Sequence, residues 1–184
     1  NSTIGIYQNL SLNLPIVVYF IVITLFIVGS ANAINFTDGL DGLLGVVAIP
    51  TYFFFFMISD KSEVQLFCLI MIGCLLGFLI YNIFPARAFM GDTGSLAIGG
   101  SLSFLAIIEK VEILIPVLFF IYFAEQLSVI LQVASFKSTG KRIFRMTPIH
   151  YHYGLKYGWG ETTIVTAFGF ISWICTFICY AYWK

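Results

Sequence analysis

Apolar runs long enough to cross a lipid bilayer recur along this chain of 184 residues, and they restrict its fold more than any other feature. A bilayer core about 30 Å thick is spanned by about 20 mostly apolar residues in a helix. Six such runs are present, the second short with an internal proline and the fourth rich in Gly and Ser: residues 15–33, 43–58, 64–84, 95–108, 113–134 and 162–183. The sequence therefore predicts an all-α, polytopic transmembrane helical bundle of about six helices, in one integral-membrane domain over residues 1–184.

Charge is too scarce for a water-soluble domain. Asp, Glu, Lys and Arg make up 10% of the residues and hydrophobic residues 60%, whereas an ordinary soluble domain carries about 25% charged residues. Nine basic and nine acidic residues give no net charge, which argues against nucleic-acid binding. The four cysteines lie in apolar runs without zinc-type spacing, so neither a disulfide framework nor a metal cluster is expected.

Six spans place alternate connections on opposite sides of the membrane, and basic residues choose between the two orientations. The connections after the first, third and fifth spans hold six of the nine Lys and Arg residues, which predicts that they are cytoplasmic. They are also the polar, motif-like connections: residues 32–42, 85–95 and 135–161. The two outer connections are short and plain. We therefore expect the chemistry to be gathered on the cytoplasmic face.

The first polar connection, NAINFTDGLDG, contains Asn32, Asn35, Asp38 and Asp41 at three-residue steps. On a helix end, this spacing puts the four polar groups roughly on one face. A helix C-cap followed by a turn would also explain Asn, Asp and Gly here. Carboxylates at a membrane boundary are nevertheless costly unless they meet water, a cation or a substrate. Two Asp residues with amide oxygens suit Mg²⁺, which prefers hard oxygen ligands and substrate phosphates.

The second polar connection, PARAFMGDTGS, has a single acid, Asp92, between Gly91 and Gly94. Glycines there allow the backbone to approach a phosphate or a metal, and an N-cap of the fourth span is the structural alternative. Phe89 is either a membrane-interface aromatic residue or a ring that stacks on a base. Asn82, at the end of the third span, is either a functional amide or a hydrogen-bonding group between helices.

The third polar connection carries both histidines, His150 and His152, and five of the nine basic residues. The basic residues suit anionic lipid headgroups or a phosphate. Histidines one residue apart do not share a helical face, which weakens a two-His metal site and leaves phosphate binding, proton transfer or a structural role. Glu125 is an intramembrane acid and so a functional candidate, with a helix-packing hydrogen bond as its expected role.

Acids suited to Mg²⁺ and bases suited to phosphate on one face favour phosphoryl transfer between a soluble and a lipid partner. A cation transporter is the competing class. It would place acids at the bilayer midplane, and only Glu125 fits that position.

Three motifs resemble a known family: NAINFTDGLDGL, FPARAFMGDTGSLAIGG and EQLSVILQVASFKSTGKRIFRMTPIHYHYGLKYGWGE. They follow one another as in the polyprenyl-phosphate N-acetylhexosamine-1-phosphate transferases, and RMTPIH favours the bacterial phospho-N-acetylmuramoyl-pentapeptide transferases. The resemblance implies transfer of phospho-MurNAc-pentapeptide from UDP-MurNAc-pentapeptide to undecaprenyl phosphate, with Mg²⁺, giving lipid I and UMP in peptidoglycan biosynthesis at the bacterial plasma membrane. A related GlcNAc-1-phosphate transferase and an inactive membrane partner are the alternatives.

The resemblance also implies roles for individual residues. Asp38, Asp92 and His150 correspond to catalytic positions, and Asn35 and Asp92 to polar groups at the Mg²⁺ ion. Gly39, Leu40 and Asp41 would form part of the uracil pocket, with the Phe89 ring stacked on the base. Substrate contacts are implied for Asn35, Gly39, Leu40, Asp41, Asn82, Phe89 and His152.

The sequence departs from the family pattern in several ways. Three consecutive histidines are usual where this chain has His150, Tyr151 and His152, and an acid that follows them is replaced by Gly154. Tyr151 can donate a hydrogen bond but carries no positive charge. Members have about ten membrane helices, an adjacent Asp pair with a following Lys, and a dimeric assembly. This chain starts with Asn1 and has no such pair, so we expect a C-terminal part of a longer enzyme that is inactive alone.

Overall fold

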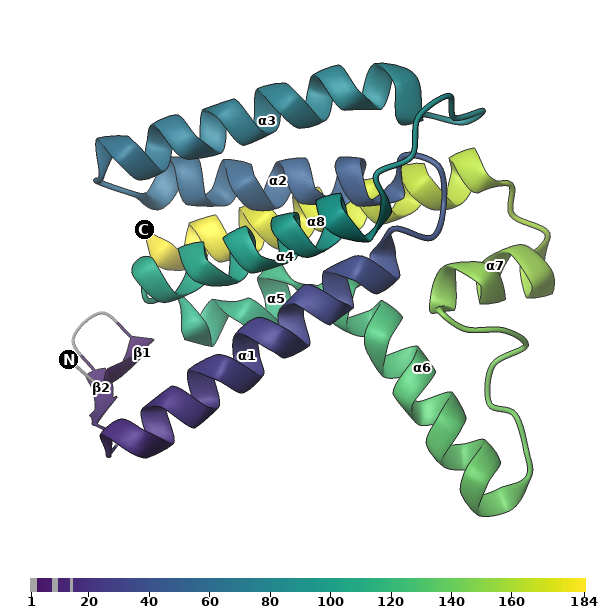
Figure 1. The fold of residues 1–184 in the computed structure, drawn as a ribbon, viewed down its shortest axis with the longest axis horizontal. Coiled ribbons are helices and arrows are strands. Elements are labelled where there is room, and N and C mark those ends of the chain that lie inside the picture. Colours follow the sequence, from purple (N-terminus) through teal and green to yellow (C-terminus); the bar gives the residue numbers. More distant parts are fainter. Residues whose placement is uncertain (1–2, 8–9, 14) are drawn as a thin grey trace.

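The computed structural model describes residues 3–7, 10–13 and 15–184, so Asn1 lies outside the described residues. Within that part, the chain forms eight α-helices, one 3-10 turn and one two-stranded hairpin (Figure 1). The elements in chain order are β1 (Thr3–Tyr7), β2 (Leu10–Asn13), α1 (Ile16–Thr37), α2 (Leu43–Ile58), α3 (Ser62–Asn82), α4 (Gly91–Ile108), η1 (Glu112–Leu114), α5 (Ile115–Leu118), α6 (Phe120–Thr139), α7 (Ile149–Tyr157) and α8 (Glu161–Trp183).

The expected all-α helical bundle is confirmed, and each apolar run falls on helical structure. Among the described residues, the helices α1, α3, α4 and α8 are each long and apolar enough to cross a membrane. The pair formed by Glu112–Leu118 and α6 adds a fifth span if it is counted as one, and α2 is a shorter apolar helix of 16 residues. The chain is therefore a multi-pass membrane protein.

The end of α1 differs from the expected run of four polar groups on one helical face. α1 continues past the predicted end at residue 33 but stops at Thr37, and the N–H of Asp38 bonds the carbonyl of Asn35 at 3.1 Å. Gly42 then has a φ of +81°, a left-handed conformation that favours glycine, and leads into α2. Asp41 consequently lies on a turn, so the expectation that it shares a helical face with Asn32 and Asn35 is wrong.

The predicted span 113–134 is not a single straight helix. It breaks at Phe119, and Glu112–Leu118 makes an angle of 74° with α6. α5 packs against α8, whereas α6 contacts α1 and leaves the bundle in Figure 1. Phe119 is fully buried, and its ring meets Tyr122 edge-on at 5.5 Å between centroids. The bend thus lies in the core, where α5 packs on α8 while α6 packs mainly on α1 and only secondarily on α8.

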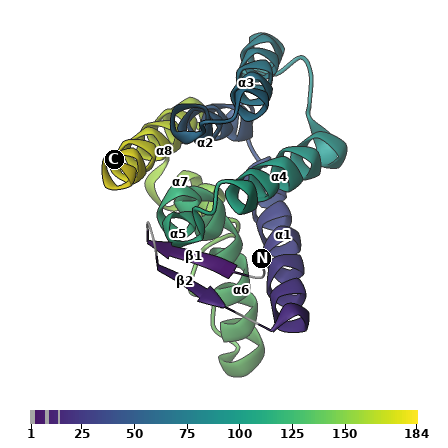
Figure 2. The same cartoon turned by 90° about the vertical axis from the view of Figure 1, so that its left-hand side faces the viewer.

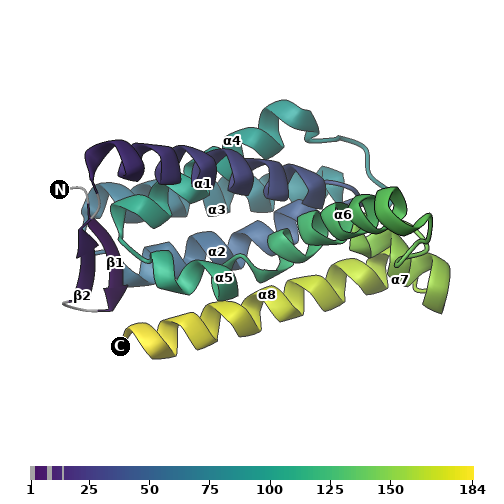
Figure 3. The ribbon, with the colours of Figure 1, turned by 90° about the horizontal axis from the view of Figure 1, so that it is seen from below.

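Small residues bring the main helices together, as expected for the fourth span. α2 lies between α3 and α8, and α1 lies beside α4 (Figures 2 and 3). A Cβ atom at Gly99 of α4 would come within 2.6 Å of the Ala31 Cα of α1. A Cβ atom at Gly169 of α8 would come even closer to the Val46 side chain of α2. Helices in lipid associate through such close backbone approach.

The chain begins with an element that the sequence did not predict, the antiparallel hairpin of β1 and β2. Thr3 pairs with Asn13 and Ile4 with Leu12, and β1 contacts η1. The hairpin lies at the same end of the bundle as the C-terminus (Figures 1 and 3).

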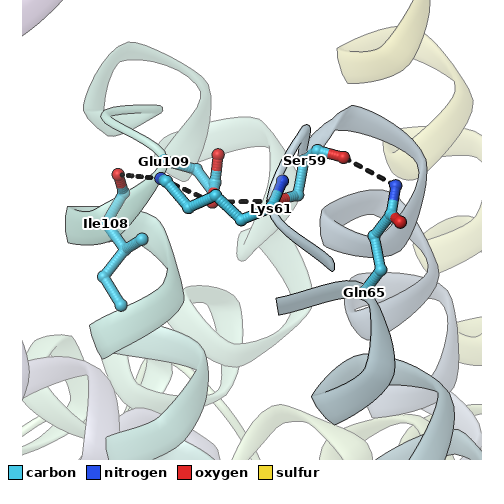
Figure 4. Close-up of polar contacts among 5 residues, drawn as sticks. All are labelled: Ser59, Lys61, Gln65, Ile108 and Glu109. Carbon is cyan, nitrogen blue, oxygen red and sulfur yellow. Dashed lines mark hydrogen bonds and ion pairs between the residues drawn. The ribbon is translucent and has the colours of Figure 1, made fainter. Parts of the chain in front are cut away.

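That end of the bundle is fastened by a set of polar contacts, which we name the Lys61 clamp (Figure 4). The Lys61 ammonium pairs with Glu109 at 3.0 Å and donates to the carbonyl of Ile108 at 3.2 Å. The Ser59 hydroxyl donates to the same Glu109 oxygen at 3.0 Å, and the Gln65 amide donates to the Ser59 carbonyl at 2.7 Å. The clamp joins the turn between α2 and α3 to the end of α4.

Candidate functional site

The three polar connections lie together at the opposite end of the bundle from the hairpin and the C-terminus (Figures 1 and 3). The turn after α1, the segment between α3 and α4, and α7 with its flanking loops all meet there. Most of the residues to which the sequence assigns a role are therefore at one end of the molecule.

A cluster of oxygen-bearing side chains joins the end of α1 to the first turn of α4, and we name it the Asn35–Asp92 cluster (Asn35, Asp38, Asp92 and Ser95). The Asn35 amide donates to Asp92 Oδ1 at 3.1 Å and to Ser95 Oγ at 2.8 Å. The Ser95 hydroxyl donates in turn to the carbonyl of Gly91 at 3.1 Å. α4 begins at Gly91, ahead of the predicted start at residue 95, so Asp92 lies in its first turn.

Asp38 completes this cluster and is electrostatically strained. The pKa of its carboxyl is raised to about 6, mainly by burial; the backbone N–H of Gly91 lowers this pKa, and the negative charge of Asp92 raises it. In the described part of the chain, neither Asp38 nor Asp92 forms an ion pair with a basic side chain. The cluster therefore holds two neighbouring carboxylates that neutral donors contact but that no basic side chain of the described residues neutralises.

The donor set fits a divalent cation that is shared with a substrate. Mg²⁺ is usually held by one or two carboxylates together with substrate phosphates and water. The cluster offers two carboxylates, and the repulsion that helps to raise the pKa of Asp38 is what a cation would relieve. Across the described residues, no group of three or more His, Cys, Asp or Glu side chains could enclose a metal by itself. The residues thus fit an open site better than a closed structural one.

Asn82 and Asp41 connect the first polar connection to the second. Asn82 is buried, accepts from the Gly42 N–H at 3.1 Å and donates to the Ala88 carbonyl at 2.8 Å. Asp41 accepts from the Ala86 N–H at 2.9 Å and borders an apolar groove of about 390 Å³ between α2 and α8. Both side chains therefore hold the loops in place, which for Asn82 is the hydrogen-bonding alternative that the sequence left open.

The remaining residues of the first two connections differ in exposure. Phe89 is 77% exposed, so its ring is free to stack on a planar group. Leu40 is partly buried against the hydrophobic core. Asn32 lies apart from the cluster, since its amide donates to the carbonyl of Val28 one turn earlier in α1, at 2.7 Å.

His150, at the start of α7, is fully buried and lies against the turn after α1. Its Nδ1 is 3.0 Å from Glu125 Oε2 of α6, and Glu125 is also fully buried. A Cβ atom at Gly39 would come within 2.5 Å of the imidazole Nε2. The Tyr151 hydroxyl donates to the Gly39 carbonyl at 3.1 Å, so the tyrosine that departs from the family pattern does serve as a donor.

The pairing of Glu125 with His150 is the contact that sequence reasoning missed. The intramembrane acid was visible, and a helix-packing hydrogen bond was expected for it, but nothing in the sequence identified the partner. The one usable signal is a buried acid in an apolar helix together with a histidine in the connection that follows it.

His152 has a different environment from His150. Its Nδ1 accepts a hydrogen bond from the Arg145 N–H at 3.1 Å, and its ring meets Phe144 edge-on at 5.4 Å between centroids. Burial lowers the pKa of His152, and the positive charges of Lys156 and Arg145 lower it further. The two histidines therefore do not converge, and His152 supports the loop between α6 and α7.

Comparison with known proteins agrees with the arrangement of the motifs. The model of the family described as glycosyl transferase family 4 matches residues 1–110. A phospho-N-acetylmuramoyl-pentapeptide-transferase of Staphylococcus carnosus (strain TM300) is 48% identical over 169 residues, which cover 90% of this chain and 52% of that protein. The protein of the same name from Bacillus subtilis (strain 168) is 50% identical over 153 residues, 82% of this chain and 47% of that protein.

The chain spans about half the length of the curated relatives it matches. The family model nevertheless covers well over half of the 184 residues, and it includes both halves of the Asn35–Asp92 cluster. The chain belongs to glycosyl transferase family 4.

Proposed function

We propose that this chain is part of an integral-membrane enzyme that transfers phospho-MurNAc-pentapeptide from UDP-MurNAc-pentapeptide to undecaprenyl phosphate, releasing UMP and forming lipid I for peptidoglycan. The observation that carries the proposal is the meeting of Asn35, Asp38 and Asp92 at one end of a membrane bundle. Its substrate assignment is supported by relatives that are named phospho-N-acetylmuramoyl-pentapeptide-transferase and are about half identical to this chain.

The proposal includes a location and an orientation. The enzyme lies in the bacterial plasma membrane with the Asn35–Asp92 cluster on the cytoplasmic side. Two arguments support this orientation: the soluble UDP-sugar is then on the same side as the cluster, and the three connections at that end carry most of the Lys and Arg residues. A homodimer, which the resemblance implies, belongs to the same proposal and is tested by light scattering of the purified enzyme.

Asn35 and Asp92 would hold Mg²⁺, with Asp38 beside them, and the bound ion would supply charge neutralisation at the substrate pyrophosphate. The Asn35 amide fixes the carboxylate of Asp92, because its hydrogen bonds to Asp92 and Ser95 leave it little freedom. Asp92 lies in the first turn of α4, where free backbone N–H groups and the helix dipole favour phosphate oxygens. The exposed Phe89 ring stacks on the uracil, next to the turn of Gly39, Leu40 and Asp41.

The reaction needs little proton transfer from the protein. A phosphate monoester is mostly ionised near neutral pH, so an oxygen of undecaprenyl phosphate can attack the β-phosphorus of the UDP-sugar directly. The new bond joins that oxygen to the β-phosphorus, and the bond between the β-phosphorus and the bridging oxygen breaks, so that UMP leaves with the electron pair. The chain contributes orientation of the two phosphates, as expected for phosphoryl transfer.

The proposal is tested with the complete enzyme that contains this chain, purified in lipid and supplied with undecaprenyl phosphate. We expect UMP release with UDP-MurNAc-pentapeptide, abolished by EDTA and restored by Mg²⁺, and little release with UDP-GlcNAc. Equal or faster release with UDP-GlcNAc would favour the related transferase. Release that is insensitive to EDTA would refute the metal assignment.

The 184-residue chain alone is expected to form no lipid I, because the resemblance implies an adjacent Asp pair that this sequence does not contain. Measurable lipid I formation by the purified chain would contradict that part of the proposal. The complete enzyme, assayed in parallel, is the positive control.

A further inference from the structure

Glu125 is the acid that the proposed chemistry does not use, and its position is costly. It lies in α6, within an apolar sequence, and its side chain is fully buried. A lone carboxylate in such surroundings is strongly disfavoured unless it has a partner. The partner here is His150 of α7, whose Nδ1 lies 3.0 Å and whose backbone N–H lies 3.4 Å from Glu125 Oε2.

The other side of the same imidazole faces the turn after α1. A Cβ atom at Gly39 would lie 2.5 Å from both Nε2 and Cε1 of His150, so the ring fills the space that a side chain at position 39 would need. Neither ring nitrogen of His150 meets the geometry of a hydrogen bond among the described residues, and neither does Glu125 Oε1. The pair is therefore held by the charge contact at Nδ1, by the hydrogen bond from the backbone N–H and by packing, while Nε2 lies on the side of the turn.

Tyr151 holds the same glycine from a second direction. Its hydroxyl donates to the Gly39 carbonyl at 3.1 Å, and its ring lies 4.2 Å from the His150 ring between centroids. Two successive residues of α7 thus contact Gly39, the residue after Asp38. On its other side, the Gly91 N–H stabilises the Asp38 carboxylate, which lowers the pKa of this group.

We propose that Glu125 is a positioning residue, which fixes the His150 imidazole against Gly39 and thereby sets the place of Asp38 relative to Asp92. The proposal rests on the proposed function only in treating the Asn35–Asp92 cluster as a cation site. His150 is fully buried, and in this proposal it acts on the cluster through the turn.

The pair itself is tested by NMR of the 184-residue chain in lipid nanodiscs, with ¹⁵N-labelled histidine rings. The chain has two histidines, so His150 and His152 give two ring spin systems. Glu125→Gln should shift the ring nitrogens of His150 and leave those of His152 unchanged. Glu109→Gln, at the other end of the bundle, should shift neither. Unchanged His150 signals in Glu125→Gln would overturn the proposal.

The effect on the cluster is tested with Mn²⁺ as a probe, by EPR titration of the same chain without UDP-sugar or lipid phosphate. We expect Glu125→Gln to weaken Mn²⁺ binding about tenfold, about the scale of second-shell effects on metal affinity. Tyr151→Phe removes only the hydroxyl that holds Gly39, and it should weaken binding by a smaller factor. Glu109→Gln should leave binding unchanged.

A wild-type chain that binds no Mn²⁺, or equal affinities of wild type and Glu125→Gln, would overturn the inference. Circular dichroism and the thermal midpoint separate lost positioning from lost folding, and Tyr151→Phe provides the answer if Glu125→Gln does not fold. The assay contains no transferase substrate. An inactive complete enzyme would therefore count against the proposed function but would not change the interpretation of the Mn²⁺ titration.

Discussion

Glu109 and the Asn35–Asp92 cluster lie at opposite ends of the bundle, and their carboxylates have different partners. Glu109 pairs with Lys61 at 3.0 Å and accepts from Ser59 at the same distance. Asp38 and Asp92 have no such cation in the described part of the chain, and burial together with the charge of Asp92 raises the pKa of Asp38 to about 6. Glu109 is neutralised by a basic side chain, whereas Asp38 and Asp92 are not.

This contrast suggests a criterion that distinguishes a structural ion pair from a candidate binding site in a membrane protein, namely whether the carboxylate has a basic partner. A paired carboxylate stabilises the contact between two turns and has little left to offer a ligand. Two carboxylates that repel each other destabilise the free protein and gain most from a cation. The same side-chain chemistry thus stabilises the fold at the Lys61 clamp and, in the function proposed above, binds a cation at the Asn35–Asp92 cluster.

The largest expected effect on activity comes from removing a carboxylate charge from the Asn35–Asp92 cluster. Asp92→Asn in the complete enzyme should lower UMP release about 10³-fold, since electrostatic groups at a reacting phosphate contribute at this scale. Glu109→Gln is the matched control and should change release less than about twofold, because a surface ion pair contributes little. A large loss in Glu109→Gln with normal activity in Asp92→Asn would reverse the comparison.

Gly39→Ala should have the next largest effect. Its Cβ atom would meet the His150 ring at 2.5 Å, so the turn or α7 must move. We expect about tenfold lower activity of the complete enzyme and a loss of about 1–3 kcal/mol in stability, as for other overpacked cores. Gly100→Ala, whose Cβ atom would meet nothing within 4 Å, is the control, and thermal denaturation with the UMP assay measures both. Wild-type behaviour of Gly39→Ala would refute the close packing.

A smaller effect is expected from the ionisation of Asp38. Its pKa is raised from 3.8 to about 6 in the folded chain, so the folded state binds the proton more tightly. The resulting stability is fully present below pH 3.8 and is lost as the pH rises through about 6. In metal-free buffer, the thermal midpoint of wild type relative to Asp38→Asn should fall by a few degrees between pH 4 and 7, because solvent screens this half-buried group.

Addition of Mg²⁺ at pH 7 should recover that loss in wild type and not in Asp38→Asn. A midpoint difference that rises with pH over the same range would contradict the sign of the shift.

The smallest expected effect, on stability, comes from breaking the ion pair of the Lys61 clamp. Lys61→Met removes an ion pair whose lysine is half-exposed, with 50% of its side chain accessible. We expect a loss of about 0.2–1 kcal/mol that shrinks with added salt. A double-mutant cycle with Glu109→Gln, followed by thermal denaturation, measures the coupling. A coupling of several kcal/mol would mean that the Lys61 clamp is a major element of stability.

Much of the fold could be predicted from the sequence, because a bilayer imposes one rule on every span. Each apolar run must satisfy its own backbone, so hydropathy alone located the helices around Phe54 or Leu75. That the three polar connections lie at the same end also followed from the sequence, because successive spans place alternate connections on opposite sides of the membrane. The bend at Phe119 could not be predicted, since it depends on which neighbours the two halves pack against.

The candidate site was predictable in its residues but not in its contacts. The resemblance put Asn35 and Asp92 at the same ion, yet their hydrogen bond depends on how α1 meets α4, which local sequence patterns do not specify. Asp41 was placed with Asn35 by its spacing and lies instead on the turn after the helix ends. Glu125 and His150 meet only because α6 bends and α7 folds back, a consequence of tertiary packing that local patterns do not contain.

The bend of 74° at Phe119 makes α6 a lever with its fulcrum in the core. At about 1.5 Å per residue, Glu125 lies about 9 Å beyond Phe119 along α6, whereas Thr139 lies about 30 Å beyond it. A tilt of about 5° at Phe119 would therefore displace Thr139 by about 2.6 Å and Glu125 by about 0.8 Å. Because Glu125 lies close to the bend, a tilt of the distal part of α6 would move its carboxylate little relative to His150.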